Sequence, residues 1–154
     1  MEVNTGLSQN QRSMISEGLA KILADTYALY LKTQNFHWNI QGAEFFALHL
    51  LFEKQYEEMA EATDEIAERI RALGLYVDAT FTSFARETHL KETHKLLTAK
   101  DMLKDLLEGH EVLIRRTRQI LDHAEQDKDG ATVDLLGRRL GAHEKMAWML
   151  RSHL

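Results

Sequence analysis

Apolar residues recur every three or four positions through most of this chain, and no proline interrupts them. That spacing puts the apolar side chains on one face of an α-helix. The pattern covers four long stretches, at residues 8–37, 43–73, 99–127 and 131–152. A chain of 154 residues is long enough to bury one substantial core. We therefore predict a single all-α domain over residues 1–154.

Signals for helix ends agree with these ranges. Ser8 followed by Gln11 is typical of a capping box, in which each side chain bonds the backbone N–H of the other residue. Thr98 followed by Asp101 marks a second helix start. Gly74 follows the last apolar position of the second stretch and is a natural stop, because glycine adopts left-handed backbone angles without strain.

Residues 75–97 break the helical pattern between the second and third stretches. A connection of that length can return the chain to the far end of a bundle. We expect a short helix within it, around Thr82–Thr88. Two helices, a long crossover and two further helices together describe a four-helix bundle.

Composition excludes several classes of site and partner. The chain has no cysteine, which excludes disulfides and thiolate metal ligands and fits a reducing compartment. Its first 13 residues hold no basic segment followed by an apolar run, so we expect no signal peptide. No apolar stretch reaches the roughly 18 residues that a membrane span needs. A net charge of −5 makes nucleic acid a poor partner.

Two pairs of metal-ligand residue types lie in the second stretch. His49 and Glu53 are four residues apart, and so are Asp64 and Glu68. Residues four apart share one face of a helix. At about 100° per residue, all four fall in one arc beside the apolar row. The two pairs are also mirror images of each other about positions 58–59.

Distance decides whether one chain can complete a site. Eleven residues separate Glu53 from Asp64, which is about 16 Å along a helix. Metal–ligand bonds are only about 2 Å long, so one metal cannot bind both side chains of one helix. Two antiparallel copies would bring His49 against the partner's Glu68 and Glu53 against the partner's Asp64. The same arc carries small and apolar residues that suit a subunit interface: Phe46, Leu50, Ala60 and Ala67.

His37 is the fifth candidate ligand. It stands about as far before the turn at Gln41–Gly42 as His49 stands after it, so antiparallel helices would hold the two imidazoles at similar height. Two nitrogens with carboxylate oxygens suit Fe(II), Mn or Zn better than Ca or Mg. From the residues alone, a solvated acidic face with separately packed histidines remains the alternative.

Residues 33–74 resemble the signature of the Dps family, the mini-ferritins named for DNA-binding proteins of starved cells. The matching residues are His37–Asn39 as HWN, Gly42, His49, and Asp64 with Glu68 in DEIAER. The resemblance implies a ferritin-like four-helix bundle with a short helix in the long crossover between helices 2 and 3. It also implies a hollow dodecamer with a ferroxidase centre at each dimer interface.

The same resemblance implies an activity and its residues. Family members oxidise Fe(II), usually with hydrogen peroxide, store the ferric mineral inside the cage, protect against oxidative damage and are cytoplasmic, in some cases nucleoid-associated. Two irons would bind at each site, with Zn or Mn as possible substitutes. The ligands would be His37, His49 and Glu53 from one subunit and Asp64 and Glu68 from its partner. Glu53 stands where the family commonly has an aspartate.

Further residues follow from the resemblance. Trp38 matches the family tryptophan beside the centre, and Glu125, Asp129 and Asp134 are candidates for acidic pores near the start of the last helix. DNA binding is expected to be weak or absent, because residues 1–14 carry only one cation, Arg12. The basic residues of the third long helix are interpreted as a solvated face: Arg115, Arg116 and Arg118.

Three other functions are weighed against this one. A ferritin-type site inside one bundle needs Glu-x-x-His pairs, and the sequence has none. A nucleoid-associated DNA-protecting protein with little enzymatic activity is the main alternative, and a purely structural helical assembly is another. The remaining histidines show no comparable constellation and are predicted to have no such role: His89, His94, His110, His123, His143 and His153.

Overall fold

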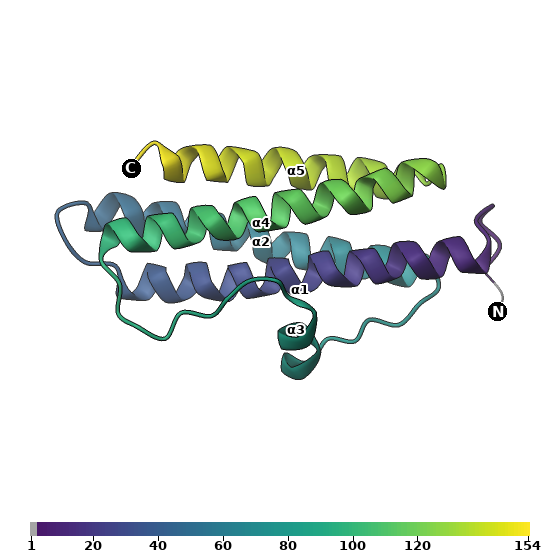
Figure 1. Ribbon diagram of the computed structural model, residues 1–154, viewed down its shortest axis with the longest axis horizontal. Coiled ribbons are helices and arrows are strands. Elements are labelled where there is room, and N and C mark those ends of the chain that lie inside the picture. Colours follow the sequence, from purple (N-terminus) through teal and green to yellow (C-terminus); the bar gives the residue numbers. More distant parts are fainter. Residues whose placement is uncertain (1–2) are drawn as a thin grey trace.

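The computed structural model describes residues 3–154, and these form helices joined by loops without any strand (Figure 1). The helices are α1 (Gln9–Asn39), α2 (Phe45–Ala72), α3 (Phe81–Glu87), α4 (Ala99–Gln126) and α5 (Gly130–Arg151). The four long helices lie side by side as a bundle, and the short α3 sits in the crossover against α1 (Figure 1). The predicted all-α bundle, with its short crossover helix, is confirmed.

Local capping residues explain where the helices begin. Ser8 Oγ accepts a hydrogen bond from Gln11 N at 3.2 Å, and the Gln11 side chain accepts one from Ser8 N at 2.9 Å. This is the predicted capping box. At the start of α4, Thr98 Oγ1 accepts from the backbone N–H of Asp101 at 3.2 Å, as predicted. The short helix α3 has a capping box of its own, between Thr80 and Ser83.

Gly74 ends α2 as expected, and its conformation shows why. Its φ is +90°, a left-handed angle that favours glycine. Leu75 N donates to Ile70 O at 3.3 Å, and Gly74 N donates to Arg71 O at 2.9 Å. These two bonds define a Schellman motif, which satisfies the last carbonyl groups of the helix.

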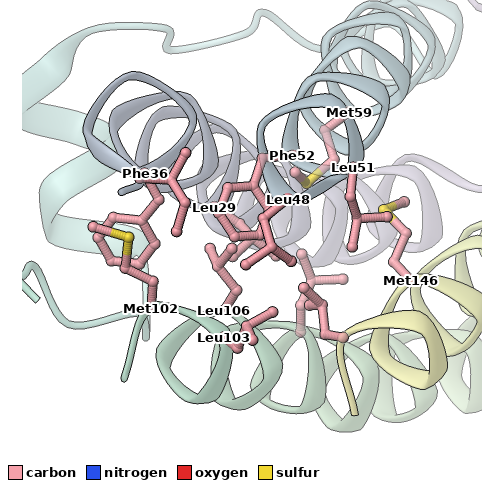
Figure 2. Packing of buried hydrophobic residues seen from close by; sticks show 13 residues of the cluster. Leu29, Phe36, Leu48, Leu51, Phe52, Met59, Met102, Leu103, Leu106 and Met146 are labelled. Atoms are coloured by element: carbon pink, nitrogen blue, oxygen red, sulfur yellow. The ribbon is translucent and has the colours of Figure 1, made fainter. Parts of the chain in front are cut away.

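The core of the bundle consists of two clusters of buried apolar residues. One cluster gathers around Phe36, Leu48 and Phe52, with leucines and methionines from α4 and α5 (Figure 2). A second cluster, towards the other end, includes Leu19 and Ile66. Fully burying such a side chain stabilises the fold by about 1.5–3 kcal/mol. The apolar periodicity of residues 43–73 therefore predicted the buried face of α2, which includes Leu48, Phe52 and Ile66.

An internal ion pair fixes the crossover. Asp25 on α1 is fully buried and accepts a hydrogen bond from Arg116 Nη1 at 3.0 Å. Its other oxygen accepts from Thr88 Oγ1 and His89 N, each at 2.8 Å. The interpretation of the basic residues of α4 as a solvated face is therefore wrong for Arg116, because its guanidinium neutralises a buried carboxylate.

Polar side chains bridge α2 and α5. Arg69 Nη2 contacts both carboxylate oxygens of Asp129, at 2.8 and 2.9 Å. Asp129 also caps α5 by accepting from Thr132 N at 3.2 Å. Burial alone would raise the pKa of the Asp129 carboxyl, but the hydrogen bonds from Thr132 and Arg69 outweigh it and hold the pKa below its usual value.

Candidate metal centre

The imidazoles of His37 and His49 lie against each other at the end of the bundle where α1 turns into α2. Their ring centroids are 3.8 Å apart and the planes differ by 15°. His37 Nδ1 lies 2.7 Å from the backbone oxygen of His49, and His49 Nδ1 lies 2.9 Å from the backbone oxygen of His37. Phe45 stacks on the outer face of His49, and Tyr56 meets His37 edge-on. The predicted equal height of the two histidines is confirmed.

These reciprocal contacts fix the tautomer of both rings. A carbonyl oxygen only accepts hydrogen bonds, so each Nδ1 must carry the proton and donate. In the neutral ring Nε2 then keeps its lone pair, which is the state that binds metal ions. Metal-binding histidines commonly use such a second hydrogen bond to orient the ring. The chain therefore presents two imidazoles prepared as nitrogen ligands.

Glu53 lies one helical turn beyond His49 and is half-buried. Its charge acts on the neighbouring phenol: burial raises the pKa of Tyr56 above its usual value, and the negative charges of Glu53 and Glu57 raise it further. Tyr56 is therefore a neutral phenol at the edge of the histidine pair.

The five predicted ligands do not meet within one chain. Asp64 and Glu68 are exposed on α2, about 16 Å or more along the helix from Glu53. Across residues 3–154, no three His, Asp or Glu side chains converge closely enough to hold a metal ion. The structure thus brings His37 and His49 together, with Glu53 one helical turn from His49, and leaves Asp64 and Glu68 far along α2.

Large apolar side chains surround the predicted ligands on the outside of the bundle. Trp38 is 63% exposed and Phe46 is 73% exposed, and Leu50 is also exposed. Further along α2, Asp64 lines a groove of about 720 Å³ between α1, α2 and α3. Its other lining residues are mostly apolar and include Tyr27, Ala60, Ala67, Phe81 and Phe84. Exposed apolar surface of this extent is typical of a protein–protein interface.

The three pore candidates differ in their surroundings. Glu125 is exposed near the end of α4. Asp134 is exposed on α5 and pairs with Arg138 at 3.0 Å. Asp129 is buried, and its carboxylate is engaged by Arg69 and Thr132, so it is not free to face an open channel. We keep only Glu125 and Asp134 as proposed pore residues.

Sequence reasoning missed a second histidine pair, inside the bundle. His110 of α4 and His143 of α5 are fully buried, with 2.9 Å between their Nδ1 atoms. Arg139 Nη2 lies 3.0 Å from His143 Nε2 and can only donate. His143 must therefore donate from Nδ1 to His110, whose buried Nε2–H has no partner. Burial lowers the pKa of His110 to about 3, so it stays neutral.

The sequence did carry a signal for this pair. Both histidines occupy positions of the apolar periodicity of their helices, His110 between Leu106 and Leu113 and His143 between Leu140 and Ala147. That pattern places a residue on the buried face but says nothing about its partner across the core.

Comparison with known proteins shows the family to which this chain belongs. A ferritin-like domain matches residues 16–154. A DNA protection during starvation protein of Porphyromonas gingivalis is 38% identical over 97% of this chain and 94% of its own length. The solved structure of DpsC from Streptomyces coelicolor superposes with a TM-score of 0.95 at 30% identity, over 99% of this chain and 90% of that chain.

A second solved structure supports the same family assignment. The Dps protein of Vibrio cholerae O1, described as a member of a broad superfamily of ferritin-like diiron-carboxylate proteins, superposes with a TM-score of 0.93. It is 32% identical, over 99% of this chain and 96% of that one. Within residues 3–154, no helix is both long and apolar enough to cross a membrane. The chain belongs to the Dps family of ferritin-like proteins.

Proposed function

We propose that this protein oxidises Fe(II) at sites shared between two subunits and stores the ferric product inside a hollow homo-oligomer, a dodecamer. The observation that carries the proposal is the reciprocal bonding of His37 and His49, which leaves two Nε2 lone pairs for a metal ion. The carboxylates that would complete a site lie too far along the same helix. A second subunit, placed antiparallel across α2, can supply them.

Each site would then combine nitrogen and oxygen ligands from both subunits. His37, His49 and Glu53 come from one subunit, and Asp64 and Glu68 come from its partner. This donor set suits Fe(II), with Zn(II) or Mn(II) as substitutes. The longer arm of Glu53, relative to aspartate, brings its carboxylate further from α2. Two Fe(II) ions bound together would supply the two electrons that reduce hydrogen peroxide to water, or dioxygen to hydrogen peroxide, so that no hydroxyl radical is released.

The exposed apolar residues near the site supply the surface for this pairing. Burying Phe46 and Leu50 against a second copy removes apolar area from water, which favours association. Trp38 would lie in the same interface, beside the iron site. Acidic residues elsewhere, Glu125 and Asp134, would attract Fe(II) to the entry pores.

We further propose that protection comes from consuming Fe(II) and peroxide in the cytoplasm. Relatives carry the name DNA protection during starvation protein, and a DNA-coating protein is the competing function. A net charge of −5 opposes binding to a phosphate backbone. A gel-shift assay at low and moderate salt tests this alternative: a shift that persists at moderate salt would favour it.

Subunit mixing tests the shared site directly. The variants His37→Ala and Asp64→Ala are each expected to lose Fe(II) oxidation, because each damages every site. When the two variants are unfolded together and reassembled, each mixed pair of subunits contains two different sites. In one site both halves are damaged, and in the other both halves are intact. With random pairing, about a quarter of the sites regain all their ligands.

The matched control mixes Asp64→Ala with Glu68→Ala. Both changes lie in the same half of the site, so no pairing restores a complete set, and activity should stay absent. Size-exclusion chromatography shows whether each mixture assembles. If the first mixture stays inactive although it assembles, or if both mixtures recover equally, the shared-site proposal is wrong.

A further inference from the structure

Three tyrosines form a row that leads away from the His37–His49 pair. Tyr56 of α2 meets His37 edge-on, with 5.2 Å between ring centroids. Tyr30 of α1 lies 5.9 Å from Tyr56, and Tyr27 lies 5.8 Å from Tyr30. Each ring is partly buried and packs against the next. The row is therefore continuous over three steps from the proposed iron ligand.

The far end of the row lies beside the other predicted ligands. Tyr27 and Asp64 line the same groove between α1, α2 and α3. In the pairing proposed above, Asp64 binds iron at the second site of the subunit pair. Within one chain, the row thus runs from the imidazole half of one iron site towards the carboxylate half of the other.

We propose that Tyr56, Tyr30 and Tyr27 form a path along which single electrons pass between the two iron sites of a subunit pair. The inference rests on the proposed function, because it takes Fe(II) and hydrogen peroxide as reactants. A tyrosine can lose one electron and its phenolic proton together, and can regain both. A phenylalanine in the same place keeps the packing but cannot take part.

The path matters when a site holds a single Fe(II). Hydrogen peroxide accepts one electron from that Fe(II) and one from Tyr56, and its O–O bond breaks to give two hydroxide ions. The phenolic proton of Tyr56 converts one hydroxide to water, and a neutral tyrosyl radical remains. Tyr30 then reduces Tyr56 by giving up its own electron and proton, and Tyr27 reduces Tyr30 in the same way.

The last step refills the path from the neighbouring site. Fe(II) there gives one electron to the Tyr27 radical and becomes Fe(III), while water in the groove returns the proton. The net reaction consumes two Fe(II) and one peroxide and forms two Fe(III) and two hydroxide ions. The two irons stand in different sites, and no hydroxyl radical leaves the protein.

Freeze-quench electron paramagnetic resonance tests the path. Protein assembled with one Fe(II) per site is mixed anaerobically with limiting hydrogen peroxide, and the tyrosyl radical and the Fe(III) formed per peroxide are measured. The proteins compared are the wild type, Tyr30→Phe and Tyr27→Phe. Tyr76→Phe is the matched control, because Tyr76 is 90% exposed and contacts Arg71 away from the row.

In the wild type we expect a short-lived radical and about two Fe(III) per peroxide. In Tyr30→Phe the radical should stay on Tyr56 and live longer, the Fe(III) yield per peroxide should fall towards one, and Tyr76→Phe should behave as the wild type. Normal Fe(II) oxidation with the same radical lifetime and yield in Tyr30→Phe and Tyr27→Phe overturns the path alone. Absence of Fe(II) oxidation in the wild type overturns the proposed function and this inference with it.

Discussion

Asp25 and Arg116 form an ion pair in the interior of the bundle, with 3.0 Å between Asp25 Oδ2 and Arg116 Nη1. The same carboxylate binds Thr88 and the backbone of His89, so one buried charge joins α1, α4 and the crossover. The crossover carries α3, which forms one wall of the groove beside Asp64. A structural ion pair therefore shapes the surface next to a predicted iron ligand.

Replacing Asp25 with asparagine should destabilise the protein strongly. The variant Asp25→Asn leaves the buried Arg116 charge without a counter-ion, which typically costs about 3–5 kcal/mol. Urea unfolding followed by circular dichroism measures the loss. Asp78→Asn is the control, because Asp78 pairs with Arg86 at 3.6 Å on the exposed surface, where such pairs contribute little. Equal losses of stability in both variants would contradict the assignment of Asp25 and Arg116 as a stabilising buried ion pair.

Adding one methyl group should lower the stability of the protein at Gly74 and raise it at Gly137. A Cβ on Gly74 would lie 2.7 Å from Val3 Cγ2 and 2.9 Å from Arg12 Nη1, on a backbone with φ of +90°. Gly74→Ala should therefore lower the free energy of unfolding by more than about 1 kcal/mol. Gly137 lies in α5 with no atom within 4 Å of such a Cβ, so Gly137→Ala should raise it by about 0.5–1 kcal/mol. Thermal unfolding gives the sign of each change, and a shared sign would count against this explanation.

The features that the sequence predicted well are local ones. Ser8 and Thr98 begin their helices and Gly74 ends one, each through a contact with a residue three positions away, so short patterns were sufficient. The histidine pair was also within reach, because a short turn and two regular helices determine the relative height of His37 and His49.

The features that the sequence could not predict depend on contacts across the bundle. The partner of Arg116 is 91 residues away, and the partner of His110 is 33 residues away. Periodicity identifies the buried face of a helix but not how neighbouring helices are rotated against it. Asp129 was predicted to line a pore, and its bond to Arg69, 60 residues away in the sequence, was hidden for the same reason.

The buried pair of His110 and His143 should make stability depend on pH. Burial lowers the pKa of His110 to about 3, and burial, His110 and Arg139 together hold the pKa of His143 well below its usual value. In the unfolded chain both titrate near 6.5. Between these values the unfolded chain binds more protons than the folded one, so stability rises as pH rises towards 6.5 and falls below it. Each group contributes a slope of at most about 1.4 kcal/mol per pH unit.

The double variant His110→Leu with His143→Leu isolates this contribution. Leucine has a similar volume and no titratable group, so the variant should lose stability less steeply than the wild type between pH 6.5 and pH 4. Urea unfolding at several pH values measures both curves. Carboxylates titrate at the low end of this pH range in both proteins. The quantity to compare is therefore the difference between the two curves of stability against pH. Parallel curves would show that the pair does not titrate on unfolding.

Removing the imidazole of His49 should weaken metal binding without changing the tautomer of His37. The carbonyl group that orients His37 belongs to the backbone of residue 49, so His49→Ala removes one ligand and keeps the tautomer of the other. Loss of a direct ligand should lower Zn(II) affinity at least as much as loss of a supporting hydrogen bond, which costs about tenfold or more. Calorimetric titration of the assembled protein with Zn(II) measures this. His94→Ala is the control, because His94 is exposed in the crossover, distant in sequence from the predicted ligands. Zn(II) binding that is unchanged in His49→Ala, or equally weakened in His94→Ala, would place the metal elsewhere.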